Sequence, residues 1–294
     1  MSPRAHASLN RSPLLRSPLH PVQLPLGLAP ALLLAACGGG TGAVQVSAWA
    51  EDTVIEGMET DDGWAISFDH WVTGLGELHL DGVDKGETVA EVEGPWVADW
   101  AAAPELIDLS LIEDLPAERY DFGFVIHPIT AESDLLTPIP DGVLETMLAE
   151  GYVHHIAGSA TKDGATLSFA WGFDAVVDYE RCTNGEDGTS GVAVPDGGEV
   201  EAQIWLHADH LLWDQLGTEE ASLAFDGIAA ADADGDLNIT AEELAAVDLA
   251  SAGYETAGVD VADLYEFITF SVSQMAHLNG GGGCTARGGE AHEH

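Results

Sequence analysis

Between about residue 45 and residue 215, hydrophobic and polar positions alternate along the chain with a period of two. In one run, Trp64, Ile66, Phe68 and His70 alternate with small or acidic residues. This pattern is typical of a strand that buries one face. Comparable runs cover 120–126, 152–160, 165–177 and 199–212.

Turn-forming residues separate these runs. Lys162-Asp163-Gly164 lies between two of them, and Asp-Gly in that position is a strong signal for a β-hairpin. One helix is expected to begin at Asp141, because apolar residues then recur at helical spacing. Several short strands joined by turns favour an antiparallel β-sandwich over residues 46–215.

From about residue 216 the spacing of apolar residues changes to the helical period of 3.6. Apolar residues show it on either side of an acidic loop and again in a later run. They are Leu223, Phe225 and Ile228 before the loop, Leu244, Val247 and Leu249 after it, and then Val261, Leu264, Phe267, Ile268 and Met275. The chain as a whole therefore predicts a mainly β protein with some α structure. A small helical segment, 216–284, follows the sandwich, and a mobile tail covers 285–294.

The first 36 residues have the features of an export signal. Arg4, Arg11 and Arg16 precede an apolar stretch over 24–36, which is too short to span a bilayer. The stretch ends in Leu34-Ala35-Ala36-Cys37, which resembles the lipobox of bacterial lipoproteins. The resemblance implies a signal peptide over 1–36 and a lipid on Cys37, with 37–45 as a flexible tether. An ordinary signal peptide with an unrelated cysteine is the alternative.

The residue after the cysteine indicates which membrane would hold such an anchor. Gly38 stands where an acidic residue often retains lipoproteins in the inner membrane. An outer-membrane location is therefore expected, facing either the periplasm or the outside. If Cys37 carries lipid, Cys182 and Cys284 remain, and an oxidising cell envelope favours a disulfide between them. Two free buried thiols are the alternative.

The charge balance limits the partners of the protein. The chain has 51 acidic residues against 8 Lys and Arg, a formal net charge of -43. Such a surface repels nucleic acid and anionic lipid head groups, so membrane attachment depends on the lipid at Cys37. Cations are the expected partners. A hydrophobic content of 46% and eight Trp argue that the chain buries a core rather than forming an acidic disordered tail.

Residues 232–243 carry the strongest chemical signal. They place oxygen-bearing side chains at alternating positions and end in Glu243. The segment resembles the twelve-residue calcium loop of the EF-hand, whose oxygens converge on one Ca²⁺. The resemblance implies side-chain, backbone or water-mediated ligands from Asp232, Asp234, Asp236, Asn238, Thr240 and Glu243.

One position departs from the EF-hand pattern. Leu237 occupies the sixth position of the loop, where Gly normally allows positive φ. A branched side chain there costs on the order of 1–3 kcal/mol, which predicts a weak affinity of roughly 10⁻⁴ to 10⁻³ M. The sequence shows no second loop of this kind. An acidic turn that binds no ion tightly is the alternative.

Histidines on the predicted strands suggest a second kind of metal site. His207 and His210 are close in sequence, and His70 or His154 could complete a copper or zinc site from neighbouring strands. The alternative is that each is an ordinary surface or hydrogen-bonded histidine. The segment 150–160 with Phe169-Ala170-Trp171 also resembles the methanobactin-associated copper-binding periplasmic proteins. That resemblance implies a β-sandwich and keeps copper as a possible ligand.

Catalytic motifs are missing from the sequence. It contains no G-x-S-x-G, H-E-x-x-H, P-loop or G-x-G-x-x-G pattern. We therefore expect a non-enzymatic calcium-binding lipoprotein of the bacterial cell envelope. Copper or zinc handling by the strand histidines is the main alternative, and a metal-dependent hydrolase is a lesser one. A third interpretation is that the acidic surface itself keeps the protein soluble in brine.

Overall fold

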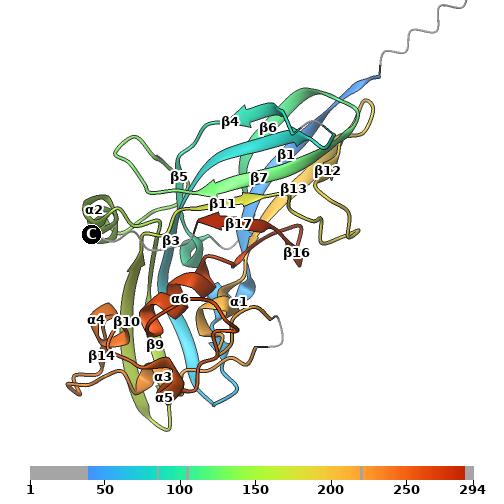
Figure 1. Ribbon diagram of the computed structural model, residues 1–294. Helices are drawn as coiled ribbons and strands as arrows, with labels where there is room; N and C mark the ends of the chain where they lie inside the picture. The colour runs from blue at the N-terminus through green and yellow to red at the C-terminus, as the bar shows by residue number, and fades with distance from the viewer. Residues whose placement is uncertain (1–38, 85, 104–105, 219–220, 289–294) are drawn as a thin grey trace, which may run out of the picture. The chain divides into compact units, whose positions relative to one another are not determined.

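The computed structural model describes residues 39–84, 86–103, 106–218 and 221–288. The expected signal peptide over 1–36 and the expected lipidation site at Cys37 lie outside the described residues. Most of the regular structure is β, as the sequence predicts, and it is arranged in two sheets (Figure 1). No helix among the described residues has the length and apolar character needed to cross a membrane.

The larger sheet is strongly curled, and its main path has the order β14-β10-β9-β3-β7-β11-β17. Neighbours on this path are antiparallel except β10 and β14, which are parallel. The strands of the path are β3 (Ala65–Gly82), β7 (Arg119–Ile126), β9 (His154–Lys162), β10 (Ala165–Phe173), β11 (Val177–Glu180), β14 (Asn238–Ile239) and β17 (Thr285–Gly288). Short strands pair beside it: β2 (Met58–Glu59), β4 (Thr88–Val92), β5 (Trp96–Asp99), β8 (Asp134–Leu135) and β12 (Val192–Ala193).

The smaller sheet has the order β16-β15-β13-β1-β6. Its strands are β1 (Thr41–Ala50), β6 (Ile107–Pro116), β13 (Glu199–Leu206), β15 (Ala276–Leu278) and β16 (Gly282–Gly283). β1 and β13 run parallel over Ala43–Ala50 and Glu199–Leu206. The expected wholly antiparallel arrangement is therefore wrong for this sheet, because two strands far apart in sequence pair here without a hairpin between them.

Short helices connect the strands. They are α1 (Asp52–Glu56), η1 (Trp100–Ala102), α2 (Asp141–Glu150), η2 (Ala208–Leu212), α3 (Asp226–Ala229), α4 (Ala241–Leu244), α5 (Leu249–Ala252) and α6 (Leu264–Val272). The helix expected from Asp141 is confirmed as α2. The run expected as a strand over 199–212 ends earlier, at Leu206, and continues as the 3₁₀ turn η2.

One hydrophobic core includes residues of both sheets and of the C-terminal helices. Val46 and Ile204 of the smaller sheet, Phe124 of the larger sheet and Phe267 of α6 all belong to it and are fully buried. Figure 1 shows the orange and red C-terminal elements beside strands from the middle of the chain: β14 next to β10, and β17 next to β11. Residues 216–284 therefore contribute to the same core as the strands that precede them.

Two expected flexible segments contain strand residues. β1 begins at Thr41, within the range 37–45, because Ala43–Gln45 already pair with β13. β17 covers Thr285–Gly288, within the range 285–294, because it pairs with β11. The disulfide between Cys182 and Cys284 is confirmed, with an S–S distance of 2.05 Å. It joins the chain just after β11 to the residue just before β17, beside the strand pair that these elements form.

Candidate metal-binding sites

Side-chain oxygens of the loop 232–243 accept hydrogen bonds from the loop's own backbone. Asp232 accepts from Gly235 N at 3.0 Å and from Leu237 N at 3.3 Å. Asp234 accepts from Asp236 N at 3.0 Å. These contacts wrap the backbone around the carboxylates, as alternating acidic residues in a tight turn allow. One carboxylate oxygen of each of Asp232, Asp234 and Asp236 lies within 4.8 Å of the others.

Glu243 closes the loop from the helix that follows it. Thr240 and Glu243 form a capping box at the start of α4, in which Thr240 Oγ1 accepts from Glu243 N and Glu243 Oε2 accepts from Thr240 N. The other carboxylate oxygen, Oε1, accepts from Ala233 N at 3.1 Å. Hydrogen bonds from the backbone and hydroxyl of Thr240 lower the pKa of Glu243, so the group is ionised at neutral pH. Glu243, the last acidic residue of the motif, thus contacts the backbone of Ala233 near its start.

Leu237 adopts the conformation that its position in the motif requires. Its φ is 70°, in the left-handed region, and 54% of its surface is exposed. An L-residue with a side chain pays roughly 1–2 kcal/mol for this conformation. The loop therefore has the backbone conformation expected with Gly at its sixth position, and the left-handed conformation of Leu237 adds strain.

The loop pairs with the larger sheet through β14. Ile239 is fully buried and lies opposite Phe169 of β10. Its carbonyl accepts a hydrogen bond of 2.9 Å from Trp171 Nε1, while Leu237 O accepts from Ser168 N at 2.8 Å. β10 of the larger sheet is thus the strand partner of this loop.

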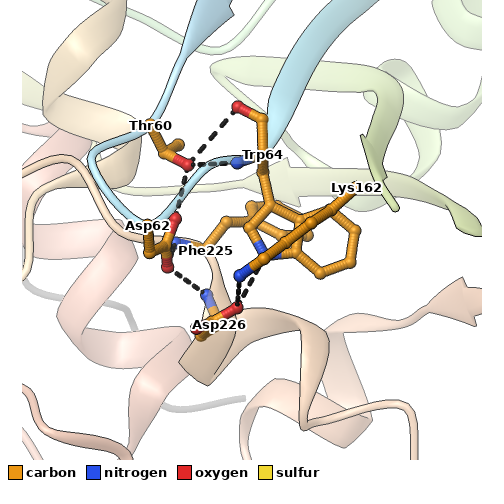
Figure 2. Close-up of polar contacts among 6 residues, drawn as sticks. All are labelled: Thr60, Asp62, Trp64, Lys162, Phe225 and Asp226. Carbon is orange, nitrogen blue, oxygen red and sulfur yellow. Dashed lines mark hydrogen bonds and ion pairs between the residues drawn. The ribbon is translucent and has the colours of Figure 1, made fainter. Parts of the chain in front are cut away.

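The turn before β3 holds the helix that leads into the loop. Asp62 Oδ2 accepts from the backbone N–H groups of Phe225, at 2.8 Å, and Asp226, at 2.7 Å (Figure 2). The hydroxyl of Thr60 donates to the other oxygen of Asp62, which orients the carboxylate. Asp62 therefore satisfies backbone donors at the start of α3 that have no partner inside a helix.

Asp226 connects α3 to Trp64, just before β3, and to Lys162 at the end of β9. Its Oδ1 accepts from Trp64 Nε1 at 2.8 Å and from Lys162 Nζ at 2.7 Å, and the lysine lies over the Trp64 ring at 5.6 Å (Figure 2). The hydrogen bond from Lys162 and then that from Trp64 lower the pKa of Asp226. The loop 232–243 is therefore attached to the larger sheet at two points, through α3 before it and through its own strand β14.

A second group of metal-ligating side chains lies at one end of the smaller sheet. Single ligand atoms of Glu51, His207 and Asp209 lie within 4.8 Å of one another, and His207 Nδ1 is 2.9 Å from Glu51 Oε1. The His207 ring centroid is 6.0 Å from that of His210 and 4.4 Å from that of His277. The structure thus brings His207 and His210 together with Glu51, Asp209 and His277. In a continuous strand His207 and His210 would point to opposite faces, but β13 ends at Leu206 and the turn η2 follows.

The other two expected histidines lie on the larger sheet. His70 Nε2 is 2.9 Å from His155 Nδ1, and the two rings are stacked. His154 is buried, with Nδ1 at 2.9 Å from the hydroxyl of Thr73, and burial lowers its pKa to about 3. Among the described residues, neither His70 nor His154 joins His207 and His210 in a group of metal-ligating atoms; β3 and β9 belong to the larger sheet and β13 to the smaller one.

Sequence reasoning missed Glu51 and His277. Glu51 follows β1 directly, and β1 pairs in parallel with β13 so that Ala50 lies opposite Leu206. His277 lies opposite Trp205 in the antiparallel pair of β13 and β15. No local spacing connects these residues with His207, so only the strand pairing reveals the group.

Comparison of the chain with protein-family models, with curated proteins and with solved structures found no match.

Proposed function

We propose that this is a non-enzymatic calcium-binding protein of the bacterial cell envelope, with Ca²⁺ bound by residues 232–243. The observation that carries the proposal is the convergence of Asp232, Asp234 and Asp236, with Glu243 folded back onto Ala233. All of these donors are oxygens, which Ca²⁺ prefers over nitrogen or sulfur. Asn238 and Thr240 supply the remaining oxygens in the proposed site.

The proposed role of the ion is structural. The loop is flanked by α3, which Asp62 holds, and by α4, and its own strand β14 pairs with β10. An ion that bridges the acidic side chains keeps these two flanks at a fixed separation and offsets repulsion among the carboxylates. A ligand that binds only the native state stabilises it by about 1.4 kcal/mol at ten times its Kd and by about 2.7 kcal/mol at a hundred times.

The proposed location is the outer membrane, with the protein held by a lipid on Cys37. The disulfide between Cys182 and Cys284 supports an oxidising compartment, because such bonds persist outside the cytoplasm. Replacement of Cys37 by Ser should move the protein from the membrane fraction to the periplasmic or culture fluid. Retention of the variant in the outer-membrane fraction would show that the anchor lies elsewhere.

Thermal unfolding with and without Ca²⁺ tests the calcium site. We expect millimolar Ca²⁺ to raise the melting temperature of the wild type by several degrees, and Glu243→Gln to abolish the rise. Glu242→Gln is the matched control, because it removes the same charge from the neighbouring residue outside the proposed ligand set. An equal rise in all three proteins, or an equal rise with NaCl of matched ionic strength, would assign the effect to general charge screening.

A further inference from the structure

The group around His207 is assembled from three strand ends and one short helix. β1 and β13 end side by side, and their next residues are Glu51 and His207. β15 brings His277 from the other side of β13. Asp209 and His210 follow within η2. Three imidazoles and two carboxylates therefore share a small volume at this end of the smaller sheet.

Several polar atoms in this group are buried without a hydrogen bond. Among the described residues, His210 Nδ1, His277 Nδ1 and Asp209 Oδ1 have no partner, and only 3% of His210 is exposed. Each buried group left in this state costs about 1–3 kcal/mol. Such atoms are rare in native proteins, and three of them in one cluster call for a common explanation. A bound cation that accepts a lone pair from each of these three atoms provides such an explanation.

The side chains of this group favour a cation. Glu51 and Asp209 place two carboxylates beside His207, and Glu51 Oε1 lies 2.9 Å from His207 Nδ1. His210 Nδ1 and His277 Nδ1 have no hydrogen-bond partner among the described residues, so each can offer a lone pair to an ion.

A cavity of about 300 Å³ borders the group. His210 and His277 both line it, together with Trp213, whose ring stacks on His210 at 3.6 Å between centroids. Trp213 Nε1 is also 3.4 Å from Asp209 Oδ2, so the indole contacts two members of the group. Two of the five residues therefore face a space beside the cluster.

We infer that Glu51, His207, Asp209, His210 and His277 form a binding site for a divalent transition-metal ion of the Zn²⁺ class. Neutral imidazole with carboxylate suits Zn²⁺, Cu²⁺ and Ni²⁺, whereas Ca²⁺ and Mg²⁺ prefer oxygen ligands alone. This site shares no residue with the loop 232–243, so the inference goes beyond the proposed calcium function and does not depend on it. Ligand atoms of Glu51, His207 and Asp209, which lie within 4.8 Å of one another, need a small inward movement to meet bond lengths of about 2.0–2.2 Å. The rings of His210 and His277, with centroids 6.0 and 4.4 Å from that of His207, need a larger one.

Isothermal titration of the full mature chain with ZnCl₂, in excess Ca²⁺, tests the inference. We expect one Zn²⁺ per chain in the wild type, at least 10-fold weaker binding in His277→Gln, and a similar loss in Glu51→Gln. Co²⁺ should give an intense visible absorption band in the wild type that Zn²⁺ displaces and that His277→Gln lacks. Near-ultraviolet circular dichroism of each variant checks that it is folded.

Two control variants separate this site from other metal-binding groups. His155→Gln removes an imidazole from the stacked pair on the larger sheet, and Glu243→Gln alters the calcium loop; both should bind Zn²⁺ as the wild type does. If His155→Gln loses the ion instead, the other histidine pair holds it and the inference is wrong. Equal Zn²⁺ binding by every variant would mean adventitious binding to the acidic surface, and no binding by the wild type would also refute the site.

Discussion

Replacement of Leu237 by Gly should stabilise the protein when Ca²⁺ is present. The residue has a φ of 70° and exposes 54% of its surface, so the substitution removes strain and loses little packing. Relief of the left-handed conformation contributes roughly 1–2 kcal/mol. The extra freedom of Gly in the unfolded chain offsets about 0.5–1 kcal/mol of this. The expected net gain is roughly 0–1.5 kcal/mol.

Equilibrium unfolding in urea, in buffer with millimolar Ca²⁺, measures this gain as a shift of the midpoint at unchanged slope. Ala257→Gly is the matched control, because Ala257 also has positive φ, 51°, and is exposed, but lies outside the calcium loop. Both variants should be more stable than the wild type. Only Leu237→Gly should also bind Ca²⁺ more tightly. The gain in affinity is a few-fold at most and depends on how much of the backbone strain arises when the ion binds.

One result would refute the reasoning. If Ala257→Gly stabilises the protein while Leu237→Gly destabilises it in Ca²⁺, the loop does not hold its sixth residue in the left-handed conformation. The EF-hand description of residues 232–243 would then be wrong, whatever metal the protein binds elsewhere.

Three further predictions concern the core, a buried histidine and the disulfide. Trp171→Phe removes the donor to Ile239 O and leaves a buried carbonyl without that partner. The change should lower the free energy of unfolding by about 1–3 kcal/mol and weaken Ca²⁺ binding. Unchanged urea unfolding would contradict this prediction. His154 has a folded-state pKa of about 3, so below about pH 6.5 the unfolded chain takes up a proton that the folded protein does not, and stability falls as the pH falls. Between pH 6.5 and 4.5 that loss is about 2 kcal/mol for this residue, and His154→Gln should therefore show a flatter pH dependence of urea unfolding than the wild type, whereas identical slopes would argue against a buried neutral imidazole. Reduction of the bond between Cys182 and Cys284, 102 residues apart, should cost up to about 4–5 kcal/mol through loop-closure entropy, which calorimetry in reducing buffer can measure; a cost near zero would indicate residual structure or strain.

The local elements of the fold could be predicted because their signals are local. The hairpin at Asp163-Gly164 forms as expected between β9 and β10, and both turn residues have positive φ, as a two-residue β-turn of this kind requires. Leu237 differs: its branched side chain favours a variant turn by local reasoning, yet the residue keeps the left-handed conformation, with a φ of 70°, that the twelve-residue motif requires. Each prediction concerns residues within a few positions of one another, whose backbone is constrained by their own side chains.

The long-range pairings could not be predicted. The parallel alignment of β1 with β13 and the pairing of β14 with β10 join segments far apart in the chain, and the strand patterns are compatible with many partners. For that reason the sequence grouped His70 and His154 with His207, and it missed Glu51 and His277. Patterns of alternation specify which face of a strand is buried and leave the identity of its neighbour open.

The sequence by itself determined the strand runs near 64–70, 120–126, 152–160 and 165–177, the hairpin at Asp163-Gly164, the helix from Asp141 and the oxygen-rich loop over 232–243. The tertiary structure alone decided that this loop pairs with β10, that its entry helix is held by Asp62, and that Glu51, His207 and His277 meet. The physical reason is that local structure depends on steric limits and hydrogen bonds between near neighbours. The meeting of distant strand ends depends on which arrangement buries one common core at the lowest free energy.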